Sequence, residues 1–394
     1  MKALVIGSMN CMPTEYAILL KKYCEEVVHY YDAGALDTLS NPKIRWGDKS
    51  KNKTHGISVR KIIFRHYLSY LLPRLFHHKM ISELNSADLI ILSGPSISLA
   101  RLVSVPGKKV IALSYGSDIS LFCNPGWPTM TVPKTCGLKG MVTPHLRLLR
   151  SKFVKMQVAG LKSCTHYSYF INGLDPETDD LLDKIFFDAI HPVRLPRYSI
   201  GLGILDMNNH TNPFLHHGDL YKILFPVRFS EHELLGNKGW RMLFDSLQKY
   251  KIVSKRKFIC ICFKKGNYYA AQTYAKEIGV DDVIEWQEVV AFDALVQYYR
   301  NADVVVEQLG SHWVAQGLFA MALGKPVIGR VSTARQIDFF KESGLLTVEN
   351  VDSLVLHLLN CESESYRDDV GNQSRTFVPA RAEIEQEFAK WGLF

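Results

Sequence analysis

Residues 302–330, ADVVVEQLGSHWVAQGLFAMALGKPVIGR, restrict the possible folds of this chain more than any other segment. Val304 to Val306 form a β-branched run, which is typical of a parallel strand buried on both faces. A polar loop and a helix of small residues over 315–323 follow, and Gly324 is suited to end that helix before the next strand. Such a unit opens a helix N-terminus toward the carboxyl ends of the strands, where open α/β sheets bind anions.

Strand-like and helix-like patterns alternate along the rest of the chain in two series. The first series has strand patterns at residues 2–7, 26–33, 87–94, 108–118 and 164–173. The second has them at 221–228, 256–266, 282–289, 302–309 and 325–331, with helices near 238–250, 268–279 and 291–300. This alternation predicts an α/β protein with two Rossmann-like, doubly wound parallel sheets. We expect a first domain over 1–195, a linker over 196–220, a second domain over 221–376, and a final helix over 377–394 that packs back toward the first domain.

Composition excludes several classes of protein. Hydrophobic residues make up 47% of the chain, yet no apolar run of about 18 residues would form a spanning helix. The N-terminal segment 2–7 fits a buried strand better than a signal peptide. Eight cysteines are scattered without a C-x-x-C pair, which favours reduced thiols in a cytoplasmic protein. The fourteen histidines show no H-E-x-x-H pattern, so we expect no bound metal.

Positive charge is unevenly placed in a chain whose formal net charge is +8. Residues 51–80 carry almost no acid, and residues 138–162 carry none. Within them, 61–80 and 146–162 combine basic and apolar residues at helix-like spacing, which suits contact with an anionic membrane surface. A solvated basic helix packed on a sheet would show the same pattern. Nucleic acid is a weaker alternative, and we expect no nucleic-acid partner.

Four segments of the second half occur in the order found in one enzyme family. They are FPVRFSEHELLGNKGWRMLFDSL, ICICFKKG, VIEWQEVVAFDALVQYYRNADVVVEQL and AMALGKPVIG. Together they resemble the donor domain of GT-B glycosyltransferases, specifically the retaining nucleotide-sugar enzymes of bacterial polysaccharide assembly. In the first half, YGSDI is similar to a GSD loop of a bacterial subgroup. The resemblance implies two domains facing a cleft, hexosyl transfer from a nucleotide-sugar to a lipid-linked or glycan acceptor, and no cofactor or metal.

The chemistry of such a transfer selects the candidate residues. A nucleoside diphosphate gains negative charge as it leaves, and fixed cations and helix N-terminal amides stabilise that charge. The resemblance implies Arg228 and Lys238 in this role, although the segment between them is longer than usual. Asp118 is the candidate polar group of the first domain, or else a helix N-cap. Candidate donor contacts are Gly266, Gln287, Glu288, Glu307, Gln308, Ser311, His312, Gln316 and Gly317. Candidate acceptor-side residues are Gly7, Ser8, Tyr115, Gly116 and Ser117.

The chain departs from the family at three positions. Phe319 stands where relatives carry the glutamate that binds ribose, so Gln316 or Glu307 would have to take that role. Tyr115 replaces a histidine, and Ser120 replaces a frequent arginine. These departures leave open a GT-B-like binding protein that has lost the chemistry. A nucleotide-sugar epimerase is a further alternative, which would require acidic and histidine residues around the sugar.

Overall fold

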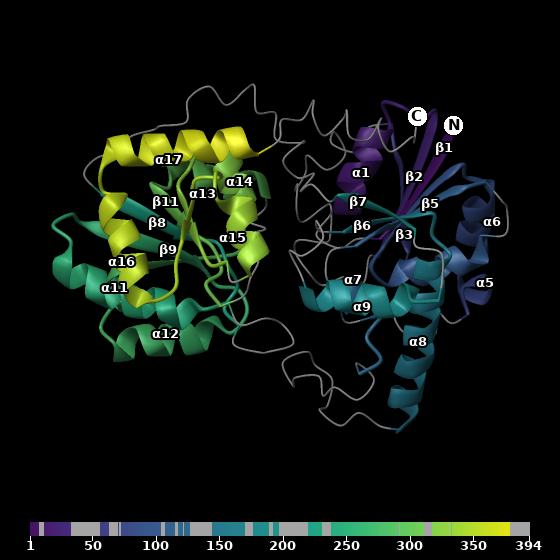
Figure 1. Ribbon diagram of the computed structural model, residues 1–394, viewed down its shortest axis with the longest axis horizontal. Coiled ribbons are helices and arrows are strands. Elements are labelled where there is room, and N and C mark those ends of the chain that lie inside the picture. The colour runs from purple at the N-terminus through teal and green to yellow at the C-terminus, as the bar shows by residue number, and fades with distance from the viewer. Residues whose placement is uncertain are drawn as a thin grey trace. The chain divides into compact units, whose positions relative to one another are not determined.

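The computed structural model describes most of the chain as two compact units. The described residues are 1–7, 12–32, 56–62, 70, 72–103, 107–114, 117–120, 122–126, 144–169, 176–188, 192–196, 220–230, 238–290, 292–310, 317–331 and 333–378. One unit is drawn from residues 1–200 and the other from residues 201–385 (Figure 1). The predicted linker over 196–220 and the predicted final helix over 377–394 lie almost entirely outside the described residues.

The first unit contains a seven-stranded parallel sheet in the order β3-β2-β1-β4-β5-β6-β7. Its strands are β1 Lys2–Ile6, β2 Glu26–Asp32, β3 Ser58–Ile62, β4 Leu89–Ser93, β5 Lys109–Leu113, β6 His166–Tyr169 and β7 Val193–Pro196. Its helices are α1 Met12–Leu20, α5 Pro73–Phe76, α6 His78–Ser86, η3 Gly94–Leu102, α7 Ser117–Ser120, α8 Pro144–Lys162 and α9 Pro176–Phe186. The strand order reverses between β1 and β4, so their carboxyl ends flank the position where such sheets bind ligands.

The second unit contains a six-stranded parallel sheet in the order β10-β9-β8-β11-β12-β13. Its strands are β8 Tyr221–Phe225, β9 Phe258–Phe263, β10 Ile284–Gln287, β11 Val304–Val306, β12 Val327–Gly329 and β13 Leu345–Thr347. Its helices are α11 Trp240–Val253, α12 Tyr268–Glu277, η8 Asp281–Val283, α13 Phe292–Asn301, α14 Gly317–Ala322, α15 Ala334–Phe340, α16 Val351–Asn360 and α17 Glu364–Phe377. Here the order reverses between β8 and β11, and this pair holds the candidate site.

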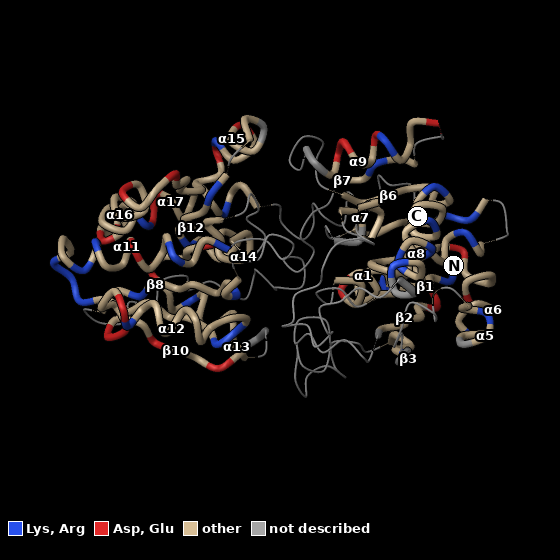
Figure 2. Tube along the Cα trace, turned by 90° about the horizontal axis from the view of Figure 1, so that it is seen from below, with Lys and Arg blue, Asp and Glu red and all other residues tan. Residues whose placement is uncertain are grey.

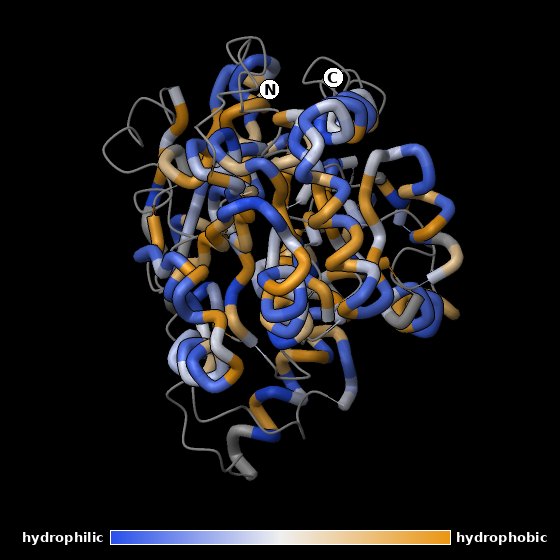
Figure 3. Tube along the Cα trace, turned by 90° about the vertical axis from the view of Figure 1, so that its left-hand side faces the viewer, coloured by the Kyte–Doolittle hydropathy of each residue, from blue (hydrophilic) through white to orange (hydrophobic). Residues whose placement is uncertain are grey.

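Two hydrophobic layers hold the second sheet between its helices. Val304 and Val306 pack in the layer formed with α11, α12 and α16, whereas Val305 packs in the opposite layer with α13, α14 and α15 (Figure 1). Successive side chains of a strand point to opposite faces, so this β-branched run must be buried on both sides. Along the helices, hydrophobic and hydrophilic residues alternate as expected for elements with one face on the sheet (Figure 3).

The structure confirms the predicted fold class of two doubly wound parallel sheets. Each strand predicted from a buried apolar run is present, usually a few residues shorter than its pattern. The expectation of one basic helix across 61–80 is wrong. Residues 58–62 form β3, and the separate short helices α5 and α6 start at Pro73 and His78. The basic segment 146–162, in contrast, lies within the single helix α8.

Candidate functional site

Arg228 lies on a short segment that follows β8 and is attached to the loop after β9. The amide of Phe229 donates to the carbonyl of Lys265 at 3.0 Å, and the amide of Asn267 donates to the carbonyl of Phe229 at 2.9 Å. Gly266 makes this contact possible: its φ is +76°, and a Cβ there would lie 2.3 Å from the Phe229 oxygen. The residues on either side of Arg228 are buried while Arg228 is exposed, so its guanidinium faces solvent.

An aromatic cluster in the core fixes the position of the segment that carries Arg228. The ring of Phe229 lies 5.4 Å from that of Trp286, 6.0 Å from that of Trp240 and 6.0 Å from that of Phe244, measured between ring centres. Phe229 and Trp240 are each 1% exposed. Aromatic pairs at these separations contribute packing energy beyond simple area burial. The backbone of Arg228 is therefore held by the core, and the residue itself is exposed at the surface.

Lys238 is tied by its backbone to both strands at the reversal of strand order. Its amide donates to the carbonyl of Ser230 at 3.0 Å, and its carbonyl accepts from the amide of Leu309 at 3.0 Å. The first bond closes the longer segment over 231–237, whose residues lie outside the described part of the chain. The extra length therefore does not carry Lys238 away from Arg228.

The charges around Lys238 leave this end of the sheet positive. The Nζ of Lys238 donates to the Oε1 of Gln308. Burial lowers the pKa of Lys238 from 10.5 to about 8; the positive charge of Arg228 also lowers it, and the carboxylate of Glu307 raises it. Glu307 is 1% exposed and Gln308 is 5% exposed. Two neighbouring cationic side chains are suited to a ligand that carries more than one negative charge.

The N-terminus of α11 adds to this positive end. Gly239 precedes the helix with a φ of +67°, and the first turn of α11 contains no acidic side chain. A Cβ on Gly239 would lie 2.4 Å from the amide nitrogen of Gly310, so the loop after β11 approaches the start of the helix closely. Gly239 was not among the candidate residues predicted from the sequence, although it belongs to a segment that resembles the family. Helix N-terminal amides and cationic side chains both favour anions, so the start of α11, Arg228 and Lys238 together form a candidate anion-binding site.

Two further predicted donor contacts lie at the end of β10. Gln287 accepts a hydrogen bond from the hydroxyl of Tyr298 at 3.1 Å, and its carbonyl accepts from the amide of Lys264 at 2.8 Å. Glu288 is exposed and forms an ion pair with Lys264 at 2.6 Å. The carboxyl ends of β9 and β10 are thus joined next to the loop that contains Gly266.

The remaining donor candidates divide between the core and the part of the chain outside the description. Gly317 begins α14 and is buried. Phe319 is 8% exposed and packs in the layer with Leu224 and Val305, so this position belongs to the core and offers no polar group. Ser311, His312 and Gln316 lie outside the described residues. Glu307 is the candidate ribose-binding carboxylate within the described residues.

On the acceptor side, the structure places Gly7 at the carboxyl end of β1. Its φ is +137°, and a Cβ there would lie 2.8 Å from the Cβ of Ser93 at the end of β4. His29, which the sequence analysis missed, bonds through Nε2 to the Gly7 carbonyl at 3.0 Å, and burial lowers its pKa from 6.5 to about 4. His29 lies within the predicted strand over 26–33, and nothing in that pattern indicates a hydrogen bond to Gly7. Ser8, Tyr115 and Gly116 lie outside the described residues, and α7 includes Ser117 and Asp118, whose side chains are not described.

A cavity of about 580 Å³ lies in the first unit, between α7, α8 and α9. Its lining includes the polar residues Ser120, Asn124 and Thr178 and the basic residues Lys162 and Lys184. The ammonium group of Lys162 forms an ion pair with Asp188 at 3.0 Å. Its volume is within the range of small-molecule sites. The described residues contain no group of three or more His, Cys, Asp or Glu side chains that could hold a metal ion. Within the same residues, no helix is both long and apolar enough to span a membrane.

Comparison with known proteins identifies the fold. No family model matches the chain, and no curated protein matches it in sequence. Among solved structures, HepE of Anabaena in complex with UDP and glucose is similar, with a TM-score of 0.65 and 13% identity over 99% of this chain and 98% of that one. The lipopolysaccharide outer core galactosyltransferase WaaB is similar over 100% of both chains, with a TM-score of 0.53 and 16% identity. A putative UDP-N-acetylglucosamine 2-epimerase from Listeria monocytogenes has a TM-score of 0.55 and 13% identity over 100% of this chain and 96% of that one. These likenesses show that the chain has the GT-B fold.

Proposed function

We propose that this protein is a glycosyltransferase that transfers a hexosyl group from a nucleotide-sugar, with retention, in the assembly of a bacterial surface polysaccharide. The observation that carries this proposal is the group formed by Arg228, Lys238 and the N-terminus of α11 at the reversal of strand order. Open α/β sheets bind ligands at this point, and a diphosphate matches the charge of the site. HepE, with the same fold, binds UDP.

The proposed reaction exchanges one glycosidic bond for another. The bond between the anomeric carbon and the donor diphosphate breaks, and a bond forms from that carbon to an acceptor hydroxyl oxygen on the same face. The proton of the hydroxyl passes to the departing phosphate oxygen. Arg228 and Lys238 stabilise the negative charge that grows on the diphosphate, which is the main electrostatic demand of the step. We expect such a transfer to need little from a protein base and to proceed without a bound metal.

The acceptor is proposed to bind the first unit and to be a lipid-linked or growing glycan. The cavity between α7, α8 and α9 supports this assignment through its hydroxyl, amide and ammonium groups. Sugar hydroxyls pair with hydroxyl and amide groups. A phosphate on a lipid-linked acceptor would pair with Lys184, because the ammonium group of Lys162 already forms an ion pair with Asp188 at 3.0 Å. Ser120, which lines the cavity, is the last residue of α7, and α7 directly follows the predicted acceptor loop at 115–116.

A nucleotide screen tests the donor site. We expect one of UDP, GDP, CDP, CMP and dTDP to raise the thermal midpoint of the purified protein and to bind with a sub-millimolar Kd by calorimetry. Incubation of the matching nucleotide-sugar with and without acceptor separates the alternatives. Sugar transfer supports the proposal, and conversion of the nucleotide-sugar without acceptor indicates an epimerase. If none of the nucleotides binds to the folded protein, the chain is a GT-B-like binding protein without a donor site.

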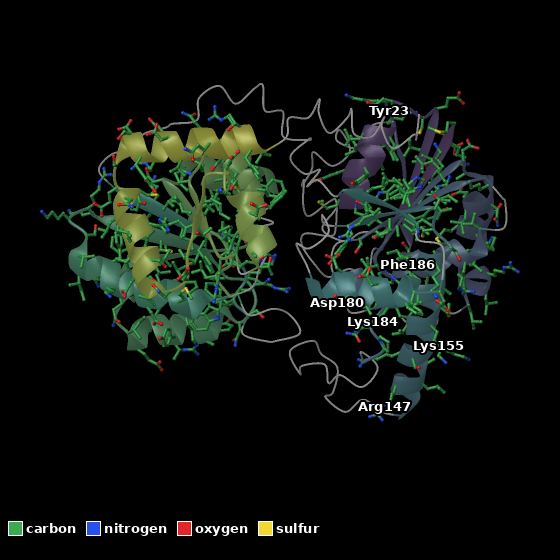
Figure 4. The ribbon with its side chains drawn as sticks, viewed as in Figure 1. Tyr23, Arg147, Lys155, Asp180, Lys184 and Phe186 are labelled. Atoms are coloured by element: carbon green, nitrogen blue, oxygen red, sulfur yellow. The ribbon has the colours of Figure 1, made fainter. Side chains whose placement is uncertain are left out.

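We also propose that α8 holds the protein peripherally on the cytoplasmic face of an anionic membrane. The helix contains no acidic residue, and Leu148, Lys152 and Lys155 are exposed along one side of it. Figure 2 marks its basic residues in blue, and in Figure 4 the labelled side chains of Arg147 and Lys155 extend outward from the helix. Exposed apolar and basic side chains together are typical of helices that lie on lipid headgroups.

Reversing the charge of α8 tests this membrane contact. The double variant Lys152→Glu/Lys155→Glu is expected to bind phosphatidylglycerol-containing vesicles at least roughly tenfold more weakly, because each lysine contributes about 1 kcal/mol near an anionic surface. Co-sedimentation with vesicles measures the effect, and pure phosphatidylcholine vesicles supply the background. Lys276→Glu, which reverses one exposed charge on α12 of the second unit, is the control. Equal binding by the double variant and wild type would show that α8 is simply a solvated basic helix.

A further inference from the structure

The ammonium group of Lys238 is held by the neutral side-chain amide of Gln308, although the residue next to Gln308 in the sequence carries a carboxylate. Its Nζ donates to the Oε1 of Gln308. Glu307 directly precedes Gln308, and the main chain after Gln308 is fixed by the bond from the Leu309 amide to the Lys238 carbonyl at 3.0 Å. The side chains of Lys238 and Gln308 are therefore brought together by the backbone as well as by their own hydrogen bond.

The carboxylate of Glu307 is engaged locally. Its Oε1 accepts a hydrogen bond from the amide of Gln308 at 3.2 Å, and its side chain is 1% exposed. Its charge acts on Lys238 only at longer range, together with the opposing charge of Arg228. The described residues therefore place Arg228, Glu307 and Gln308 around the ammonium group, and the group in hydrogen-bond contact carries no charge.

This arrangement has a chemical consequence for an anion-binding lysine. A carboxylate in the position of Gln308 would neutralise the ammonium group and would compete with an incoming phosphate. An apolar residue would leave the long lysine side chain without a fixed direction. An amide oxygen accepts one of the three ammonium hydrogens and leaves the positive charge and two donors for a ligand.

We propose that Gln308 is a positioning residue that directs the ammonium group of Lys238 toward the donor diphosphate without neutralising it. This inference rests on the proposed function, since it takes the diphosphate as the ligand of Lys238. It assigns Gln308 a role different from the direct donor contact expected from the sequence. Gln308 acts through Lys238 and does not contact the reacting atoms.

Binding should then depend on pH in a definite direction. Lys238 has a lowered pKa of about 8 in the free protein, so it is charged below that pH and loses its proton above it. A bound diphosphate favours the charged form and raises this pKa. Binding above pH 8 therefore requires uptake of a proton, and the affinity for UDP is expected to fall as the pH rises through about 8.

Two substitutions of Gln308 separate its effect on the orientation of the Lys238 side chain from its effect on the charge of that side chain. Gln308→Glu is expected to raise the pKa of Lys238, to weaken UDP binding roughly tenfold at neutral pH, and to move the pH-dependent fall to a higher pH. Gln308→Leu is expected to weaken binding by a similar factor without moving the fall upward. Gln248→Glu, an exposed Gln-to-Glu change on α11, is the matched control and should bind as wild type does.

Calorimetry with UDP, and with inorganic pyrophosphate as a base-independent probe, gives the Kd across pH. Competitive acetylation of Lys238, read by mass spectrometry, gives its titration midpoint in each variant without any ligand, and thermal midpoints show that each variant is folded. A wild type that binds neither pyrophosphate nor any nucleotide of the screen overturns the proposed function. A wild type that binds, with Gln308→Glu showing the same Lys238 midpoint and the same UDP profile, overturns the role of Gln308 alone.

Discussion

Arg228→Ala is expected to lower sugar transfer roughly 100- to 1,000-fold while leaving the thermal midpoint almost unchanged. The guanidinium is exposed, and the packing of this segment depends on its buried neighbours Val227 and Phe229. Removing the side chain therefore deletes a positive charge at the proposed diphosphate position without opening a cavity. Turnover with the nucleotide-sugar found in the screen, together with a thermal melt, measures both quantities.

Arg256→Ala is the control for this experiment, because it also removes an exposed arginine of the second unit. Arg256 lies between α11 and β9, at the opposite end of the strands from Arg228. We expect its transfer rate to match that of wild type. A folded Arg228→Ala variant with unchanged turnover would remove the diphosphate assignment and, with it, the main support for the proposed function.

Gly239→Ala is expected to destabilise the second unit and to weaken nucleotide binding at least roughly tenfold. A φ of +67° costs an alanine about 1–2 kcal/mol. Its Cβ would also lie 2.4 Å from the Gly310 nitrogen and 2.6 Å from the Leu309 carbonyl carbon, and both are backbone atoms. The loop after β11 must therefore move away, which separates Gln308 from Lys238. Thermal melts and UDP calorimetry measure the two effects.

Gly279→Ala separates backbone strain from the clash. Gly279 has a φ of +74°, and a Cβ there meets no atom within 4 Å. This control should lose only the stability that the strained φ costs, and it should bind UDP as wild type does. If Gly239→Ala matched it in both melting temperature and UDP affinity, the close approach of α11 to Gly310 would have no role in the site.

The strands that could be predicted from the sequence are those whose own residues dictate burial. FICICF of β9 and the valine run of β11 must be covered on both faces wherever they lie. β3, whose sequence SVRKI is polar, was not predicted, and neither were β7 and β13. All three are edge strands that exist through pairing with a neighbour, which is a tertiary effect that local patterns do not show.

The candidate site was predictable in its residue types but not in its contacts. The order of the family segments was sufficient to select Arg228 and Lys238. The bond between Lys238 and Gln308 joins residues 70 positions apart and depends on how β8 and β11 pair, so no spacing rule would reveal it. Phe319 was predicted to lack the ribose contact of relatives, and the structure adds that it packs in the core.

The aromatic cluster beneath Arg228 gives the donor side an intrinsic optical signal. Trp286 and Trp240 both lie against Phe229, the residue that directly follows Arg228. Indole emission depends on the polarity and packing around the ring, so a shift of this segment on nucleotide binding changes the fluorescence of the unlabelled protein. Trp286→Phe would remove the nearer emitter while keeping an aromatic ring in the cluster. The residues that hold the arginine in place therefore also allow binding of the proposed nucleotide to be followed by tryptophan fluorescence.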